Sequence, residues 1–369
     1  MVASNELHVV SPEEIRQQSR AVGFDLCGIA PAGALPELAF LRDWLDRGYA
    51  GDMTYMHESA NRRADVREVL PSAESVIVLG TVYNVDRPYS TEEADRSRAA
   101  IARYAWGDDY HAVIRRRMAR LLEWLRKAAG EGFEALAYVD TGPVQERVYA
   151  QHAGIGWIGK NTCVINAERG SWIFLSEIIC NLPLEPDAPA LDQCGTCSLC
   201  LEACPTGALV EPRVLDSTRC LSYLTIELKG GIPPAQRRAL SRHAYGCDIC
   251  QEVCPWNLTP STAISSDPSW LPRAGLDGPH LLDLWRRSDD ELRRLLKGSA
   301  MKRAGAARLR RNLAIAIGNT GGAEAIEALE SQDDATGRDP IVAEHVTWAI
   351  AEIDARKAGV RASSPELAR

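Results

Sequence analysis

Eight of the eleven cysteines in this chain of 369 residues lie between positions 194 and 254. The first four follow the pattern C-x2-C-x2-C-x3-C-P, in which three thiolates wrap one [4Fe–4S] cluster and the fourth reaches a second cluster. A shorter copy of the pattern follows and also ends in Cys-Pro, and an upstream cysteine replaces its missing first member. We therefore predict two clusters, one held by Cys194, Cys197, Cys200 and Cys254, the other by Cys204, Cys220, Cys247 and Cys250.

Disulfides and zinc are the alternative uses for so many cysteines. Disulfides suit small secreted chains, whereas the start, Met-Val-Ala-Ser-Asn-Glu, has neither a basic leader nor an apolar signal core. Zinc accepts two C-x2-C pairs, but it requires neither a third cysteine at the next step nor a proline after Cys204 and Cys254. The spacing therefore favours iron–sulfur clusters, and with them single-electron transfer.

The composition, 46% hydrophobic and 25% charged, is typical of a globular chain with two or three domains. No apolar run approaches the roughly 18 to 20 residues of a membrane-spanning helix, so we expect a cytoplasmic protein without a membrane partner. The net charge of −8 argues against unspecific nucleic-acid binding over the whole surface. A local basic patch is still compatible with that charge.

The residues before the cysteines must position any further chemistry. Strand-like runs alternate there with helical patterns, which predicts an α/β or α+β domain. Ser11 and Glu14 form a capping-box pattern that opens a helix, and a long amphipathic helix is expected over 110–129. The expected strands are 25–30, 75–79, 135–139, 162–166 and 171–179, and the proline-rich segment 183–189 is the expected linker.

Two motifs in this first part are candidates for ligand binding. Residues 154–159 match G-x-G-x-x-G, but a helical stretch precedes the motif and a strand-like run follows it, so we reject a nicotinamide site. These glycines could instead let the backbone approach a flat or bulky cofactor. Asp140 lies where a strand ends and a helix begins, a position that suits either a cap or a catalytic group.

The region after the clusters is expected to be helical, with helix pairs of the HEAT type over 311–350 that pack on the preceding domain. Segment 286–311 has a net charge of +7, which leaves −15 for the rest of the chain. A solvated helix face would explain such a run, but this segregation favours a surface that docks a polyanion. Its basic residues are Arg286, Arg287, Arg293, Arg294, Lys297, Lys302, Arg303, Arg308, Arg310 and Arg311.

Together these features resemble the epoxyqueuosine reductase family, cobalamin-dependent iron–sulfur enzymes of tRNA modification. The resemblance is carried by the eight cysteines and by five blocks of sequence: 103–111, 139–143, 154–161, 220–227 and 246–251. It implies a cobalamin-binding catalytic domain over 1–183, a ferredoxin-like domain with two [4Fe–4S] clusters over 184–262, and a helical, HEAT-like tRNA-binding domain over 263–369.

The activity implied by this resemblance is the reduction of epoxyqueuosine to queuosine at the wobble position of tRNA, the last step of queuosine biosynthesis. Cob(I)alamin would perform the difficult step, with electrons delivered through both clusters from an external low-potential donor such as a flavodoxin or ferredoxin. The resemblance also suggests a monomer. A cobalamin-dependent reductive dehalogenase is the alternative from the same cofactor class, although dehalogenases generally carry an export signal and have no use for a basic helical tail.

The resemblance also assigns roles to individual residues. Asp140 would be the proton donor, with its pKa raised by burial against the macrocycle. Lys229, Arg310 and Arg311 would contact tRNA. Residues expected to line the cobalamin are Arg63, Arg103, Tyr104, His111, Asp140, Ile158, Gly159, Lys160 and Ser222.

Overall fold

The computed structural model describes residues 10–258, 264–331 and 339–359. The expected boundary at 262/263 lies outside the described residues, as does the end of the chain after residue 359. Among the described residues no helix is long and apolar enough to cross a membrane.

A four-stranded sheet forms the centre of the first part of the chain. Its strand order is β1-β2-β7-β4, and every neighbouring pair is antiparallel. All four strands were expected from the alternation of apolar residues, and their ends shift by a few positions. The strands are β1 (Leu26–Pro31), β2 (Ser75–Val82), β4 (Ala135–Tyr138) and β7 (Ile173–Cys180).

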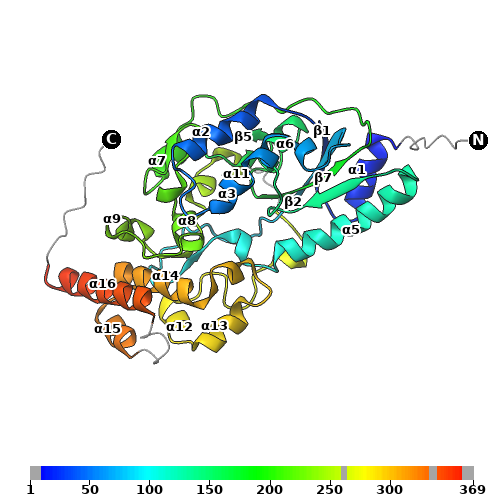
Figure 1. The fold of residues 1–369 in the computed structure, drawn as a ribbon. Coiled ribbons are helices and arrows are strands. Elements are labelled where there is room, and N and C mark those ends of the chain that lie inside the picture. Colours follow the sequence, from blue (N-terminus) through cyan, green and yellow to red (C-terminus); the bar gives the residue numbers. More distant parts are fainter. Residues whose placement is uncertain (1–9, 259–263, 332–338, 360–369) are drawn as a thin grey trace, which may run out of the picture.

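Helices cover both faces of this sheet because the central strands are apolar on both sides. Ile77 and Leu79 of β2 pack with α5 (Tyr110–Ala129) on one face. Val76 and Val78 pack with α6 (Glu146–His152) on the other. The helix expected over 110–129 is therefore confirmed, and α1 (Pro12–Ala21) begins with the expected capping box. Figure 1 shows α5 running along the sheet.

Short helices and strands make up the rest of the chain up to residue 258, around the sheet and the cysteines. The glycine motif 154–159 follows α6 and runs into a small hairpin, so a helix precedes it, as the rejection of a nicotinamide site requires. The remaining elements up to residue 258 are α2 (Phe40–Asp46), α3 (Thr54–Glu58), α4 (Ala60–Ala64), β3 (Ala100–Ile101), β5 (Trp157–Ile158), β6 (Val164–Ile165), α7 (Leu199–Ala203), β8 (Leu209–Glu211), β9 (Val214–Leu215), α8 (Leu221–Ile226), α9 (Pro234–Arg237), β10 (His243–Tyr245), α10 (Ile249–Glu252) and α11 (Pro255–Leu258).

The end of the described chain is helical, and its helices gather on one side of the molecule (Figure 1). They share a hydrophobic core with Ile101, Ile226 and Tyr245 from earlier segments, so they pack on the preceding part as expected. The helices are α12 (Leu281–Trp285), α13 (Asp289–Leu296), α14 (Gly305–Thr320), α15 (Ala323–Glu330) and α16 (Pro340–Lys357).

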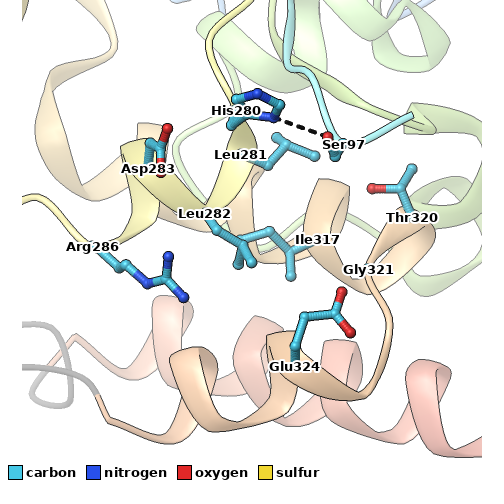
Figure 2. Close-up of a pocket in the computed structure, with 10 residues that line it drawn as sticks. All are labelled: Ser97, His280, Leu281, Leu282, Asp283, Arg286, Ile317, Thr320, Gly321 and Glu324. Carbon is cyan, nitrogen blue, oxygen red and sulfur yellow. Dashed lines mark hydrogen bonds between the residues drawn. The ribbon is translucent and has the colours of Figure 1, made fainter. Parts of the chain in front are cut away.

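A cavity of about 280 Å³ lies among these helices, lined from α12, α14 and α15 and from the segment around Ser97. Figure 2 shows Arg286 and Glu324 on opposite sides of this space, and a hydrogen bond from Ser97 to His280. Apart from Arg286 of the basic segment, no residue predicted to hold cobalamin, a cluster or tRNA lines it.

Candidate active site

The two predicted sets of cysteines are brought together as two separate groups. Cys194, Cys197, Cys200 and Cys254 line one cavity, together with Pro255 and Trp256. In the second set, Cys220 lies within electrostatic reach of Cys204, and Cys250 lies within reach of Cys220 and Cys247. Each group thus combines cysteines that are distant in sequence. The first motif contributes Cys204 to the second group and the second motif contributes Cys254 to the first, as the spacing predicts.

The first group also receives N–H donors. The indole Nε1 of Trp157 lies 3.4 Å from Sγ of Cys194, and the backbone nitrogen of Lys160 lies 3.5 Å from the same sulfur. Hydrogen bonds to cluster sulfurs are one means by which a protein adjusts the reduction potential. Among the described residues no three His, Cys, Asp or Glu side chains are arranged to hold a single metal ion. In a cube each thiolate binds its own iron, so four ligands surround a volume and do not converge on a point.

A carboxylate site forms where β4, α5 and α6 meet. Asp140 follows β4, as expected, with a backbone φ of 58°. The hydroxyl of Tyr110, the first residue of α5, donates a hydrogen bond of 2.8 Å to Oδ2 of Asp140. The backbone N–H of Asp140 donates one of 2.6 Å to Oε1 of Glu146, the first residue of α6. Two helix starts therefore fix Asp140, whose side chain is 53% exposed.

His111 stands between two carboxylates. Its Nδ1 lies 2.8 Å from Oδ1 of Asp109, the cap of α5, and its Nε2 lies 3.3 Å from Oδ2 of Asp140. Burial alone would lower the pKa of His111, but these two contacts outweigh it and raise the pKa. The Nε2 atom makes no aligned hydrogen bond among the described residues, so its contact with Asp140 is electrostatic.

The pKa of Asp140 was expected to be raised by burial, and this expectation is wrong. Burial pushes the pKa of Asp140 upward, but the contact with His111 and the hydrogen bond from Tyr110 outweigh it and hold the pKa below its ordinary value. Glu146 behaves in the opposite way, because burial and then the charge of Asp140 raise its pKa to about 8. The contacts of Asp140 therefore favour its ionised form, whereas burial favours the protonated form of Glu146.

Arg303 connects the basic segment to this site. Its guanidinium makes two hydrogen bonds with Glu227, of 2.6 and 2.9 Å, and lies 6.0 Å from the ring centre of Tyr55. Its charge also acts on Asp140. From the sequence, Arg303 was identified only as one of the basic residues of segment 286–311. Its proximity to Asp140 could not be predicted, because the two residues are distant in sequence.

The residues expected to line cobalamin are spread around this site, and some are already engaged. Arg63 is within electrostatic reach of Asp140. Tyr104 shares a hydrogen bond of 3.2 Å with Tyr245. Ile158 and Gly159 lie at the small hairpin, and Ser222 lies in the first turn of α8, two residues after Cys220.

Two residues that were expected to contact cobalamin make hydrogen bonds to backbone carbonyls. The Arg103 guanidinium is buried and donates to the carbonyls of Val85, Arg87 and Pro88. The Lys160 ammonium donates to two carbonyls of the first cysteine loop, at 2.7 and 2.8 Å. Both side chains are therefore already engaged by backbone carbonyls, and their contact with a cofactor stays a prediction.

Arg310 and Arg311 do not form the predicted phosphate contacts. They are 2% and 1% exposed, because α14 is buried on all sides by its neighbours. Arg311 donates to the carbonyls of Leu224, Leu228 and Gly230, while Arg310 pairs with Asp289 and backbone carbonyls. The exposed basic residues of the segment are Arg286, Arg293, Arg294, Lys297, Lys302 and Arg303, and Lys229 is exposed as well.

Comparison with known proteins agrees with this geometry. The family model described as "Epoxyqueuosine reductase QueG, DUF1730" matches residues 63–141, and that of the "4Fe-4S double cluster binding domain" matches residues 193–257. The epoxyqueuosine reductase of Xanthomonas campestris is 40% identical over 345 residues, which cover 92% of this chain and 95% of the relative.

Solved structures show the same fold. A crystal structure of epoxyqueuosine reductase with an epoxyqueuosine-modified tRNA-Tyr stem loop matches with a TM-score of 0.83 at 31% identity, covering 92% of this chain and 89% of that one. The enzyme from Bacillus subtilis, in a structure with its catalytic aspartate loop swung out of the active site, matches with a TM-score of 0.81 at 29% identity, covering 96% and 95% of the two chains.

Proposed function

This chain belongs to the epoxyqueuosine reductase family, and from that membership we propose that it reduces epoxyqueuosine to queuosine at the wobble position of tRNA. The observation that carries the proposal is the combination, in one chain, of two grouped cysteine sets with a carboxylate site at the meeting of β4, α5 and α6. Removal of an epoxide oxygen as water needs two electrons and two protons. Clusters on the cysteine sets would deliver the electrons, and the carboxylate site would deliver the protons.

The cysteines would hold the two [4Fe–4S] clusters in the sets given above. An external low-potential donor, such as a flavodoxin or ferredoxin, would reduce them one electron at a time. The N–H groups of Trp157 and Lys160 at Cys194 would stabilise the reduced, more negative cluster. We propose residues 184–262 as the cluster domain on this basis.

The residues around Asp140 fit a cobalamin in their chemistry. Asp140, Arg303 and the ring of Tyr55 are partly exposed, and Nε2 of His111 is buried without an aligned hydrogen-bond partner among the described residues. Arg63, Tyr104, His111, Asp140, Ile158, Ser222 and the backbone at 159–160 would hold it, within a catalytic domain of residues 1–183. When bound, cobalamin supplies a cobalt centre of low potential that can reduce a carbon–oxygen bond.

Asp140 would pass protons to the substrate oxygen. Its carboxylate contacts the Tyr110 hydroxyl and the His111 imidazole, so it would accept a proton from within the protein and present it at the exposed side. A positioned acid of this kind typically accelerates a reaction by about 10²–10⁴-fold. The loop described for the Bacillus subtilis relative, which carries a catalytic aspartate and can leave the active site, supports this role.

The tRNA would dock through the exposed basic side chains of segment 286–311 and through Lys229, in a helical domain of residues 263–369. We propose that α14 and α16 form a HEAT-like pair that supports this surface, because they pack along each other and on the middle of the chain. Arg303 would join the surface to the site, since it belongs to the basic segment and acts on Asp140. The stem-loop complex of the related reductase supports an anticodon arm as the bound element.

Anaerobic reconstitution tests this function. The chain is loaded with iron, sulfide and cobalamin, reduced, and incubated with tRNA that contains epoxyqueuosine, and the nucleosides are read by mass. We expect the loss of one oxygen, dependent on cobalamin and on the reductant, from a monomeric enzyme. Intact epoxyqueuosine after incubation with a fully loaded chain would contradict the proposal, and turnover of a halogenated aromatic in its place would favour the dehalogenase interpretation.

A further inference from the structure

Two carboxyl groups, Glu146 and Glu177, lie behind Asp140, and the function described so far gives neither of them a role in proton transfer. Glu177 is in the middle of β7, paired with Val78 of β2 and Tyr138 of β4, and it is fully buried. It faces α6, because its neighbours on that side of the strand, Leu175 and Ile179, pack with that helix. An ionised carboxylate at such a position would be very costly without partners.

Glu177 has no ordinary partner for a charge. Neither of its oxygens receives a hydrogen bond from an N–H or O–H group among the described residues. Glu146 begins α6, the helix that Glu177 faces, and its carboxyl group acts on Glu177 electrostatically. Two neighbouring carboxyl groups inside the protein disfavour the state in which both are ionised, so the pair favours retention of a proton.

The charges around the pair support this state. Burial and then the charges of Glu146 and Asp140 raise the pKa of Glu177 well above its ordinary value. The cations that face Glu146 are Arg63 of α4 and Arg147 of α6, and they only partly offset its burial and the charge of Asp140. The Tyr110 hydroxyl on α5 is also held neutral, since burial and then Asp140 raise its pKa.

We propose that Glu146 and Glu177 form a two-carboxyl proton store that reloads Asp140, so that the site can deliver both of the protons that one turnover consumes. This inference rests on the proposed function. The reaction breaks the two C–O bonds of the epoxide and forms one C=C bond. Two electrons arrive through the clusters, and the oxygen leaves with two protons as water.

Asp140 can carry only one of these protons at a time. Glu146 is placed to restore it, because its Oε1 accepts the backbone N–H of Asp140 at 2.6 Å. Its proton would reach the Asp140 carboxylate through water. Glu177 then refills Glu146 from the interior. Glu146 and Glu177 are thus positioning residues for protons, and Asp140 alone meets the substrate.

The first test does not depend on activity. Infrared spectra of the loaded wild-type chain at pH 7 should contain the band of a protonated carboxylic acid that disappears in the double variant Glu146→Gln/Glu177→Gln. Glutamine keeps the shape and leaves an acceptor for the N–H of Asp140. The control Glu123→Gln changes an exposed residue of α5 and should keep the band. Absence of the band from the wild type would overturn the proposal.

The second test is the pH profile of turnover. In the wild type kcat should fall as the pH rises above about 8, where the store loses its proton. The double variant should lose that alkaline limb and show a kcat at pH 7 lower by about tenfold or more, with an unchanged KM for tRNA and unchanged iron and cobalamin content. Each single variant should cost about as much as the double variant, since the two residues act as one unit.

The outcomes separate this inference from the proposed function. An active wild type beside a double variant with unaltered kcat and pH profile would overturn the store alone. A loaded wild-type chain that does not convert epoxyqueuosine would overturn the proposed function, and the role of the store with it. If the double variant does not fold, the pH profile of kcat is measured for Glu177→Gln alone. Glu177→Asp serves as the conservative variant and should partly restore the wild-type profile.

Discussion

Asp140→Asn separates the proton transfer by this residue from its structural role. Asn tolerates the left-handed backbone conformation that Asp140 adopts, with its φ of 58°. The backbone N–H can still bind Glu146, and the amide oxygen can still accept the hydrogen bond from Tyr110. The substitution should therefore change the free energy of unfolding by less than about 1 kcal/mol.

The catalytic cost should be much larger than the cost in stability. An amide cannot donate an acidic proton, so the contribution of a positioned acid is lost, about 10²–10⁴-fold in rate, or roughly 2.7–5.4 kcal/mol. The loss should appear in kcat, because the exposed basic residues that would bind tRNA are unchanged. The pKa of His111 should also fall, since Asp140 is one of the two carboxylates that raise it.

Single-turnover conversion of epoxyqueuosine in tRNA, read by nucleoside mass, measures this effect. Iron content, cobalamin content and tRNA affinity are recorded on the same preparations and should match the wild type. The reasoning would be refuted by a variant that keeps more than about a fifth of the wild-type rate, because no positioned acid contributes so little.

Four further predictions test other parts of the account. Cys254→Ser should remove about half of the iron bound after reconstitution and leave the second cluster's spectrum intact, because only the first set includes this residue; loss of all iron would contradict the two-set arrangement. Lys302→Glu should raise the KM for tRNA and reduce the dependence of binding on salt, whereas Lys127→Glu, on the distant end of α5, should change neither. Arg311→Ala should lower the free energy of unfolding by about 3 kcal/mol or more, since three backbone carbonyls lose their buried donor; an unchanged thermal midpoint would contradict the burial of this side chain. Glu177 should make stability depend on pH: the folded state keeps a proton that the unfolded chain releases near the ordinary pKa of 4.5, so the free energy of unfolding should fall as the pH rises above that value, and Glu177→Gln should reduce this fall in denaturant titrations.

Features that depend on local sequence could be predicted. The cysteine spacing is a local pattern, and it anticipates which thiols the fold gathers, including the distant Cys254. The helix α5 matches its expected bounds because a long apolar stripe and the cap at Asp109 both lie within one segment. The run expected as a strand over 162–166 is only the second arm of a small hairpin, since pairing is limited to two residues on each side.

Features that depend on tertiary packing could not be predicted. A count of basic residues over 286–311 does not show that α14 enters the core, so Arg310 and Arg311 were expected at the surface. The low pKa of Asp140 arises from contacts with another helix, not from its own segment. Glu177 left a signal in the sequence, as the one charged residue of the apolar run 173–180, but its partner Glu146 is known only from the fold.

The most direct test of the central claim is complementation in a bacterial strain that lacks its own epoxyqueuosine reductase. The strain supplies an electron donor, cobalamin and modified tRNA, and nucleoside mass spectrometry compares queuosine with epoxyqueuosine. Expression of this chain should restore queuosine, and expression of Asp140→Asn to the same level should leave epoxyqueuosine. Persistence of epoxyqueuosine with the wild-type chain, once both clusters are found in the purified protein, would contradict the account.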